Sequence, residues 1–386
     1  MDSMIQRYNQ SHIVRDLDRK MVLLSGPRQA GKTTLAKSLR SVWENLQYLN
    51  FDSTADRRIF LKESWSRSCD LVVFDEIHKH RYWKNKIKGV YDTEGPRPRL
   101  LVTGSARLAL YQKKGDSLVG RYLHHRLYPL SLREVNPAPR ESRGTVESML
   151  ALGSFPEPFL SQSQTEARRW RRQYLNLVVT QDILQLEDVR NISSLELLVE
   201  LLRERVGSPI SFSSLARDLE VAPNTVRRYV EILERLYVVF RVMPYHRNVA
   251  RAILKEPKIY FFDVGLVAGD RGPRFENLIA LHLLKHLHFL EDTQGAEARL
   301  HYLRDKQERE VDFLWTEDVE ASRGRADKTM LLEVKTADEP PSRSLRYFAE
   351  RLGFKAAQVS LDARQQQQFE GISVLPAAEF LSSLAC

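Results

Sequence analysis

"MVLLSGPRQAGKTTLAKSL", residues 21–39, decides the fold of the N-terminal part of this 386-residue chain. Its apolar start, 21–24, predicts a strand, and residues 34–39 predict a helix. The pattern G-x-x-x-x-G-K-[ST], from Gly26 to Thr33, therefore lies between a strand and a helix. Glycines let the backbone turn its amides toward phosphate oxygens, and the helix N-terminus adds partial positive charge. The stretch predicts a phosphate-binding loop.

The expected nucleotide-binding residues follow one another along this loop. They are Gly26, Pro27, Arg28, Gln29, Ala30, Gly31, Lys32, Thr33 and Thr34. Lys32 can reach the β- and γ-phosphates of ATP, and the Thr33 hydroxyl is placed to bind Mg²⁺. The loop therefore predicts ATP and Mg²⁺ as cofactors.

A second apolar run, in "CDLVVFDEIHK" (69–79), ends in two acidic residues. Asp75 is expected to join Thr33 as a Mg²⁺ ligand at the end of a buried strand, and Glu76 to orient and deprotonate the attacking water. An acidic pair suits water better than a substrate hydroxyl, which disfavours a small-molecule kinase. The two motifs together predict an ATP hydrolase site.

Two further positions are candidates for contact with the γ-phosphate. The strand "RLLVTGSA" (99–106) ends in Thr103 and Ser105, whose hydroxyls can hold the water or the phosphate. A strand-end turn explains these residues equally well. Arg121, which follows Gly120, can contact the γ-phosphate within the chain or from a neighbouring copy, or be an ordinary surface cation.

Four blocks of the sequence resemble one family. "LLSGPRQAGKTTL", "VVFDEIHK", "LLVTGSARL" and "LVGRYLHHRLYPLSLRE" are similar to the bacterial and archaeal AAA+ ATPases near the STAND group. The resemblance implies an ATPase core followed by a helical segment, a winged helix and a C-terminal domain of unassigned function. It also implies a homo-oligomer in which Arg121 or Arg107 reaches a neighbouring copy.

The stretch "SPISFSSLARDLEVAPNTVRRYV" predicts two amphipathic helices at helix-turn-helix spacing, the second starting at Pro223. The apolar segments "LYVVFRVMPY" and "PKIYFFD" are expected to form the wing that follows. The second helix carries residues that suit DNA phosphates and base edges, namely Asn224, Thr225, Arg227 and Arg228. Packing against another domain is the alternative use of such a helix.

The C-terminal part carries acidic residues on three successive elements. Glu276 begins the helical stretch "GPRFENLIALHLLKHLHFL", and Asp312 lies in the expected hairpin "RLHYLRDKQEREVDFLW". In "MLLEVKTA" (330–337), Glu333 and Lys335 share one face of a strand. This is the element order of the PD-(D/E)xK nuclease fold, a restriction-endonuclease-like α/β domain.

These residue types suit metal-dependent cleavage of a phosphodiester. Asp312 and Glu333 can bind Mg²⁺, or Mn²⁺ in its place, and the ion activates water. Lys335 can position or deprotonate that water, and Glu276 completes the acidic cluster. An ion pair between Glu333 and Lys335, in a domain that binds without cutting, is the alternative.

Composition narrows the partners and the compartment. The formal charge of +9 favours acidic partners, with nucleic acid, and DNA in particular, first among them. Cys69 and Cys386, the only cysteines, cannot supply a disulfide framework or a cysteine metal cluster. The polar start and the lack of an apolar run of membrane-spanning length predict a cytoplasmic protein with no membrane partner.

The sequence thus predicts a multidomain α/β protein. Its expected parts are an AAA+ P-loop core (1–130), a helical lid (131–190), a winged helix-turn-helix (191–270) and a nuclease-like domain (271–386). The first functional hypothesis is an ATPase whose nucleotide state gates a metal-dependent DNA nuclease. The second is a STAND-like nucleotide switch that binds DNA or a protein partner through a non-cleaving nuclease fold.

Overall fold

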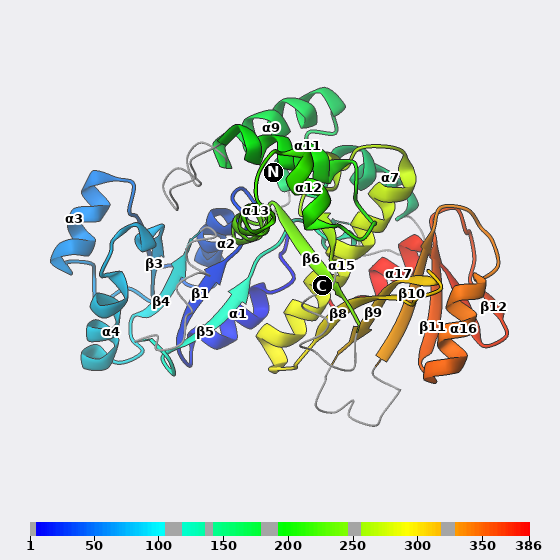
Figure 1. Cartoon of the computed structure of the whole chain (residues 1–386). Helices are drawn as coiled ribbons and strands as arrows, with labels where there is room; N and C mark the ends of the chain where they lie inside the picture. Colours follow the sequence, from blue (N-terminus) through cyan, green and yellow to red (C-terminus); the bar gives the residue numbers. More distant parts are fainter. Residues whose placement is uncertain (1–4, 105–117, 136–141, 179–191, 246–255, 318–328) are drawn as a thin grey trace. The chain divides into compact units, whose positions relative to one another are not determined.

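The computed structural model describes residues 5–104, 118–135, 142–178, 192–245, 256–317 and 329–386 (Figure 1). The chain divides into two compact units, Met1–Pro129 and Leu130–Cys386, each with a sheet of its own. Within the described residues, no helix is both long enough and apolar enough to cross a membrane.

The first unit is built on a parallel sheet of five strands in the order β2-β3-β4-β1-β5. Its strands are β1 (Met21–Ser25), β2 (Leu46–Asn50), β3 (Leu71–Asp75), β4 (Arg99–Thr103) and β5 (Tyr122–Arg126). Its helices are α1 (Gln10–Leu17), α2 (Lys32–Ser38), η1 (Leu39–Ser41), α3 (Thr54–Lys62), η2 (Ile77–Lys79) and α4 (Trp83–Glu94). Every residue of β1 and β3 is buried, as expected for parallel strands that are covered on both faces.

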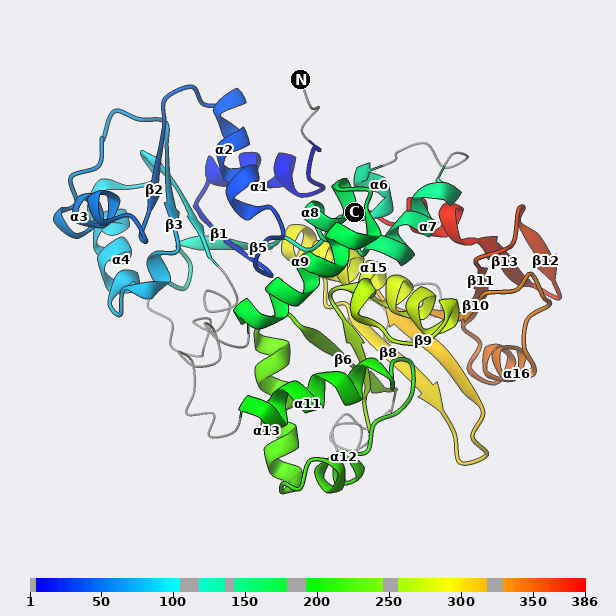
Figure 2. The ribbon, with the colours of Figure 1, turned by 90° about the horizontal axis from the view of Figure 1, so that it is seen from above.

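Two helical layers cover this sheet (Figure 2). Ile13 of α1 and Leu35 of α2 pack with Val22 and Leu24 of β1 in one apolar cluster. The helices α3 and α4 belong to the other cluster, through Phe60, Trp83 and Ile87. The register aligns the ends of the central strands, because Thr103 is paired both with Leu24 and with Asp75. The loop after β1 and the acidic end of β3 therefore meet at one edge of the sheet.

The second unit begins with helices and ends in a mixed sheet of eight strands. Its helices are α6 (Leu132–Val135), α7 (Arg143–Leu152), α8 (Pro156–Leu160), α9 (Gln164–Leu177), α11 (Ile192–Arg203), α12 (Phe212–Asp218), α13 (Pro223–Arg235), η5 (Val264–Leu266), α15 (Arg271–Gln294), α16 (Arg343–Leu352) and α17 (Ala377–Ser383). Its strands are β6 (Val239–Pro244), β7 (Lys258–Phe261), β8 (Arg299–Arg304), β9 (Glu310–Thr316), β10 (Thr329–Lys335), β11 (Lys355–Ser360), β12 (Gln367–Phe369) and β13 (Ile372–Pro376). They lie in the order β12-β13-β11-β10-β9-β8-β6-β7.

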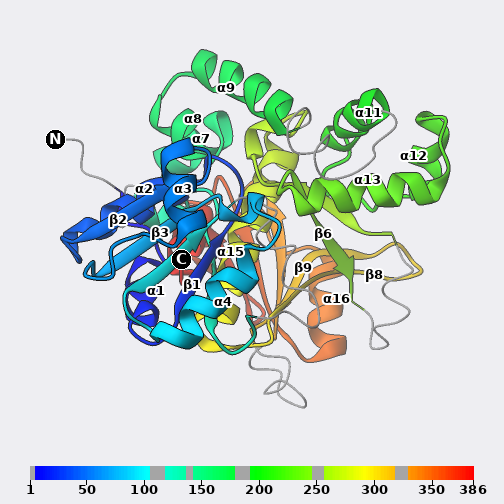
Figure 3. The ribbon, with the colours of Figure 1, turned by 90° about the vertical axis from the view of Figure 1, so that its left-hand side faces the viewer.

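The strands β6 and β7 differ from the wing that was expected of them. They pair with each other in antiparallel fashion, Val239 opposite Phe261, as a hairpin should. However, β6 also pairs in parallel with β8, Met243 opposite His301, so that both strands extend the C-terminal sheet (Figure 3). All four residues of β7 are buried, and such a strand needs cover on both faces, which an exposed wing does not offer. The boundary expected between 270 and 271 falls inside one compact unit.

An ion pair with a buried carboxylate joins the early helices of the second unit to the segment after β7. Arg171 of α9 donates through Nε to Asp263 Oδ2 at 2.9 Å, and through Nη2 to the carbonyl oxygen of Leu152. Gly153 is required here, because a Cβ at this position would lie 2.2 Å from Asp263 Oδ1. The central helix α15 contacts β7, β8 and β10, and this places Glu276 beside the sheet.

Candidate functional site

The loop between β1 and α2 has the close turns that its glycines predict. Gly26 has φ +150°, and a Cβ there would lie 2.1 Å from the carbonyl oxygen of Leu127. Gly31, at φ +96°, precedes the first turn of α2. Lys32 is buried, and its Nζ donates to the carbonyl oxygens of Gly26 at 3.0 Å and Pro27 at 2.6 Å. The ammonium group thus points into the loop, where a phosphate can replace the carbonyl oxygens.

Asp75 is held by three hydroxyl groups at the end of β3. Thr33 Oγ1 donates to Oδ2 at 3.0 Å, and Thr103 Oγ1 donates to Oδ1 at 2.5 Å. The hydroxyl of Tyr48, on the neighbouring strand β2, also donates to Oδ2. Burial and the carboxylate of Asp75 raise the pKa of Tyr48, so this residue stays a neutral donor. The oxygen donors of Thr33 and Asp75 fit Mg²⁺, which takes oxygen ligands.

Glu76 follows directly, in a left-handed conformation at φ +61°. Its backbone N–H donates to the carbonyl oxygen of Thr103 at 3.0 Å, which fixes the turn after β3. Burial raises the pKa of Glu76, while Lys79, 3.5 Å from its Oε2, acts in the opposite direction. A carboxylate with a raised pKa is a stronger base than an ordinary surface glutamate.

The structure accounts differently for the remaining predicted residues of the first unit. Pro27, Arg28, Gln29, Ala30 and Thr34 lie in the loop and the first turn of α2. Ser105 and Arg107 lie outside the described residues. Arg121 forms a two-bond ion pair with Asp92 of α4, at 2.5 and 2.9 Å, so its contact with the γ-phosphate stays a prediction.

Arg7 is a residue that sequence reasoning missed. It is buried, and its guanidinium donates to the carbonyl oxygens of Ala30 and Tyr128, each at 2.5 Å. It thereby ties the segment before α1 to the phosphate loop. Nothing in the sequence around Arg7 distinguishes it from an ordinary surface arginine.

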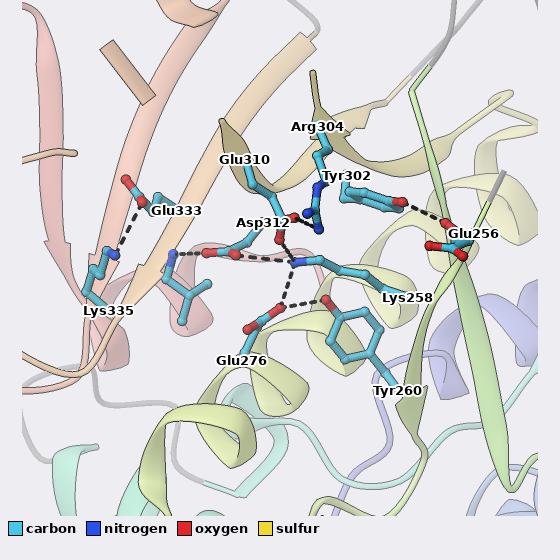
Figure 4. A network of polar contacts seen from close by, with 11 residues as sticks. Glu256, Lys258, Tyr260, Glu276, Tyr302, Arg304, Glu310, Asp312, Glu333 and Lys335 are labelled. Carbon is cyan, nitrogen blue, oxygen red and sulfur yellow. Dashed lines mark hydrogen bonds and ion pairs between the residues drawn. The ribbon is translucent and has the colours of Figure 1, made fainter. Parts of the chain in front are cut away.

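The C-terminal acidic residues come from the elements that were expected to carry them (Figure 4). Asp312 lies on β9 and Glu333 and Lys335 lie on β10, and these strands are antiparallel neighbours. Lys335 Nζ lies 3.4 Å from Glu333 Oε1. Asp312 Oδ2 accepts the backbone N–H of Val334 at 2.9 Å. Glu333 Oε2 is buried and has no hydrogen-bond partner within the described part of the chain.

A fifth residue, Lys258 at the start of β7, lies at the centre of this region (Figure 4). It is fully buried, and its Nζ lies 2.7 Å from Glu310 Oε1, 3.3 Å from Glu276 Oε1 and 3.4 Å from Asp312 Oδ1. Tyr260 donates its hydroxyl to Glu276 Oε1 at 2.7 Å. We call Lys258, Glu276, Glu310 and Asp312 the lysine cluster. Burial and the charge of Asp312 raise the pKa of Glu276 to about 7.

The predicted acidic residues of the second unit are paired with lysines. Among the described residues, no three Asp, Glu, His or Cys side chains are arranged to hold a metal ion. The carboxylates of Glu276 and Asp312 face Lys258 instead, and Glu333 faces Lys335. The one sequence signal for Lys258 was its place at the head of the apolar run "KIYFF".

The helix-turn-helix segment presents the expected side chains to solvent. The helices α12 and α13 pack together, and Asn224, Arg227 and Arg228 of α13 are exposed, while Thr225 is half-buried. The Arg227 guanidinium lies over the ring of Phe212, 5.7 Å from its centre.

Comparison with known families gives a match for most of the first unit. Residues 18–136 match a family model described as an AAA domain. This stretch is therefore similar to AAA domains. Residues 143–270 and 271–380 match two further models, both described as domains of unknown function (DUF8612 and DUF4143).

Similar proteins occur in bacteria and archaea. An uncharacterized protein of Mycobacterium tuberculosis is 28% identical over 304 residues, covering 73% of this chain and 67% of that protein. One from Methanocaldococcus jannaschii is 23% identical over 326 residues, covering 69% and 68%. Among solved structures, a Walker-type ATPase of Pyrococcus abyssi is similar at a TM-score of 0.41 and 14% identity, over 68% of this chain and 95% of that one. This structural likeness is too distant to carry an argument.

Proposed function

We propose that this protein is an ATP-hydrolysing switch: its AAA domain binds and hydrolyses ATP with Mg²⁺, and residues 130–386 bind DNA without cutting it. The observation that carries the proposal is the position of Asp75, hydrogen-bonded to Thr33 of the phosphate loop and to Thr103 of the next strand. This arrangement brings the phosphate loop, Asp75 and Glu76 to one edge of the first sheet, which supports the proposed roles.

The residues of the first unit have separable roles in this reaction. Backbone amides of the loop would bind the phosphates, and Lys32 would exchange its two carbonyl partners for phosphate oxygens. Thr33 and Asp75 would hold Mg²⁺, which neutralises charge on the phosphates. Glu76 would take the proton of the attacking water, aided by its raised pKa.

Binding of DNA is supported by charge and by exposed donors. The chain carries a formal charge of +9, and α13 presents Asn224, Arg227 and Arg228 to solvent. Such residues contact phosphates and base edges when a helix enters the major groove. Contacts with phosphates make binding weaker as the salt concentration rises.

A metal-dependent nuclease gated by ATP is the second candidate, and Glu333 is the residue that favours it. Its Oε2 is buried without a hydrogen-bond partner within the described residues, beside a strand that carries Asp312. A bound group would satisfy that oxygen. Against this candidate, Asp312 and Glu276 are already paired with Lys258.

The test compares the wild-type chain with Lys32→Ala, Glu333→Ala and the double variant Arg227→Ala/Arg228→Ala. ATP hydrolysis, DNA binding by fluorescence anisotropy and cleavage of supercoiled plasmid with Mg²⁺ or Mn²⁺ are measured in parallel. We expect Lys32→Ala to lose hydrolysis and the double variant to bind DNA about tenfold or more weakly, as each lost contact weakens binding. No lane should show cutting.

Arg168→Ala is the matched control for the double variant, because Arg168 is an exposed arginine on α9, outside the helix-turn-helix. Equal loss of binding in this control would mean that charge alone, and not α13, binds DNA. Plasmid cutting that disappears in Glu333→Ala would replace the switch with the nuclease. If the wild-type chain bound DNA equally tightly with ATP and with ADP, the nucleotide would not control DNA binding, and the protein would not be a switch.

A further inference from the structure

Lys258 is buried beside Asp312, one of the two residues predicted to bind a metal ion in the second unit. The three carboxylate oxygens nearest to it come from α15 and β9, and all lie within 3.4 Å of Nζ. The lysine itself comes from β7, a strand outside the predicted nuclease elements. In Figure 4 its side chain reaches between Glu276 and the acidic side chains of β9.

Every carboxylate of the lysine cluster has a second partner besides Lys258. Glu276 accepts the hydroxyl of Tyr260, and Asp312 accepts the backbone N–H of Val334. Glu310 lies 3.4 Å from the guanidinium of Arg304. In the lysine cluster, each carboxylate therefore has two polar partners, and none of them needs a metal ion as a partner.

The charged form of Lys258 is the stable one. Burial by itself lowers the pKa of a lysine, but the three carboxylates outweigh it and raise the pKa of Lys258 above its ordinary value. An ammonium ion removed from water is tolerated only when it is paired in this way. Lys258 and its acids therefore hold one another in place.

A divalent ion and Lys258 exclude each other. Mg²⁺ binds carboxylate oxygens at about 2.0–2.1 Å. An ion on the same oxygens would lie within about 5.5 Å of Nζ, and two cations at that distance repel strongly in a partly buried site. The remaining acid, Glu333, is paired with Lys335, and one carboxylate does not make a divalent site.

We infer that Lys258 is a built-in cation that takes the place of the metal ion in the C-terminal nuclease-like site. The inference rests on the proposed function, in which residues 130–386 bind DNA without cutting it. Under this inference, Asp312 on β9 and Glu333 and Lys335 on β10 hold their positions on neighbouring strands without a bound metal ion. Removing the lysine should open a metal site that the natural chain lacks.

The test measures binding of Mn²⁺ to the full chain without nucleotide, by the electron paramagnetic resonance signal of free Mn²⁺. Asp75→Asn is present throughout, so that the first unit contributes no metal site. The parent should bind no Mn²⁺, and adding Lys258→Ala should create one site. Mn²⁺ about 100-fold above its dissociation constant should then raise the melting temperature of that variant by about 5–10 °C.

Lys285→Ala is the matched control. Lys285 is a similarly buried lysine of α15 that is paired with the carboxylate of Glu134, outside the lysine cluster. Its removal should also lower the melting temperature, yet Mn²⁺ should not restore it. A recovery that is specific to Lys258→Ala separates a new metal site from general stabilisation by the ion.

Two results would overturn the inference. The first is binding of Mn²⁺ by the parent that Asp312→Asn abolishes. This result does not depend on whether a lysine variant folds. The second is a folded Lys258→Ala chain that binds no Mn²⁺. Failure of the proposed function is distinguishable, because a parent that binds neither Mn²⁺ nor DNA would refute DNA binding and leave the role of Lys258 intact.

Discussion

Asp75 in the first unit and Asp312 in the second are both strand carboxylates held by other side chains, but these partners differ in charge. Asp75 accepts hydrogen bonds from three neutral hydroxyl groups. Asp312 faces the ammonium group of Lys258, which it shares with two other acids. A carboxylate held by hydroxyls keeps its charge for an incoming cation, whereas one beside a fixed ammonium has already been neutralised. Under the proposed function, this difference in partners explains why Asp75 would bind a metal ion and Asp312 would not.

The largest effect that separates the two sites is expected at Glu76. Glu76→Gln keeps the shape of the side chain but removes the base, so we expect ATP turnover to fall by about 10²- to 10⁴-fold. The phosphate loop is untouched, so the affinity for ATP should stay within a few-fold of wild type. Steady-state hydrolysis and binding of a fluorescent ATP analogue measure the two quantities.

Glu44→Gln, a change at an exposed glutamate of the same unit, is the control for this measurement and should leave turnover unchanged. Unchanged turnover in Glu76→Gln would mean that the water is activated elsewhere. The comparison between the sites of Asp75 and Asp312 would then fail, because it assumes that Glu76 and Asp75 act together in ATP hydrolysis.

A pH-dependent effect of intermediate size is expected from Glu276 in the lysine cluster. Its folded-state pKa of about 7 lies above the ordinary 4.5, since burial and then Asp312 oppose its ionisation. Below about pH 4.5 both the folded and the unfolded chain carry the proton. Between about pH 4.5 and 7 only the folded chain keeps it, so the free energy of unfolding should fall as the pH rises, by roughly 3 kcal/mol.

Urea denaturation of the wild type and Glu276→Gln across this pH range measures the effect as a difference. The difference should change between about pH 4.5 and 7 and be level above it. Glu297→Gln, at an exposed position of the second unit, should follow the wild type throughout. Parallel curves for Glu276→Gln and wild type would show that the lysine cluster neutralises Glu276 more fully than its raised pKa implies.

The two sites also differ in how far the sequence could predict them. In the first unit, the phosphate loop, Asp75 and Glu76 each follow an apolar run that forms a strand. Because a parallel sheet brings the ends of its strands to one edge, their proximity could be predicted from the sequence. The partners of Asp75 were only partly predictable. Thr103 ends a neighbouring strand, but Tyr48 lies within β2, where a tyrosine is an ordinary strand residue.

In the second unit, the elements were predictable and the charge state of the site was not. Alternation predicts that Glu333 and Lys335 share one face of β10, and the structure pairs them as ions. Lys258 lies 54 residues before Asp312 and was expected in a wing. Its role depends on β6 and β7 joining the same sheet as β9, a long-range pairing that no local pattern specifies. An apolar strand predicts burial, but it does not say what is buried beside it.

The smallest effect, and the sharpest contrast with Lys258, is expected at Tyr48. Its hydroxyl donates to the same oxygen of Asp75 as Thr33 does, so one of these bonds must give way when Mg²⁺ binds that oxygen. Tyr48→Phe removes the competitor, a net hydrogen bond of about 1 kcal/mol, which corresponds to an approximately fivefold lower Mg²⁺ requirement for ATP hydrolysis. Titration of Mg²⁺ at saturating ATP measures this, with Tyr91→Phe on α4 as the control. A higher Mg²⁺ requirement in Tyr48→Phe would mean that the hydroxyl orients Asp75 for the ion and does not compete with it. The expected result would show that a neutral partner yields to a cation at modest cost, which the buried ammonium of Lys258 cannot do.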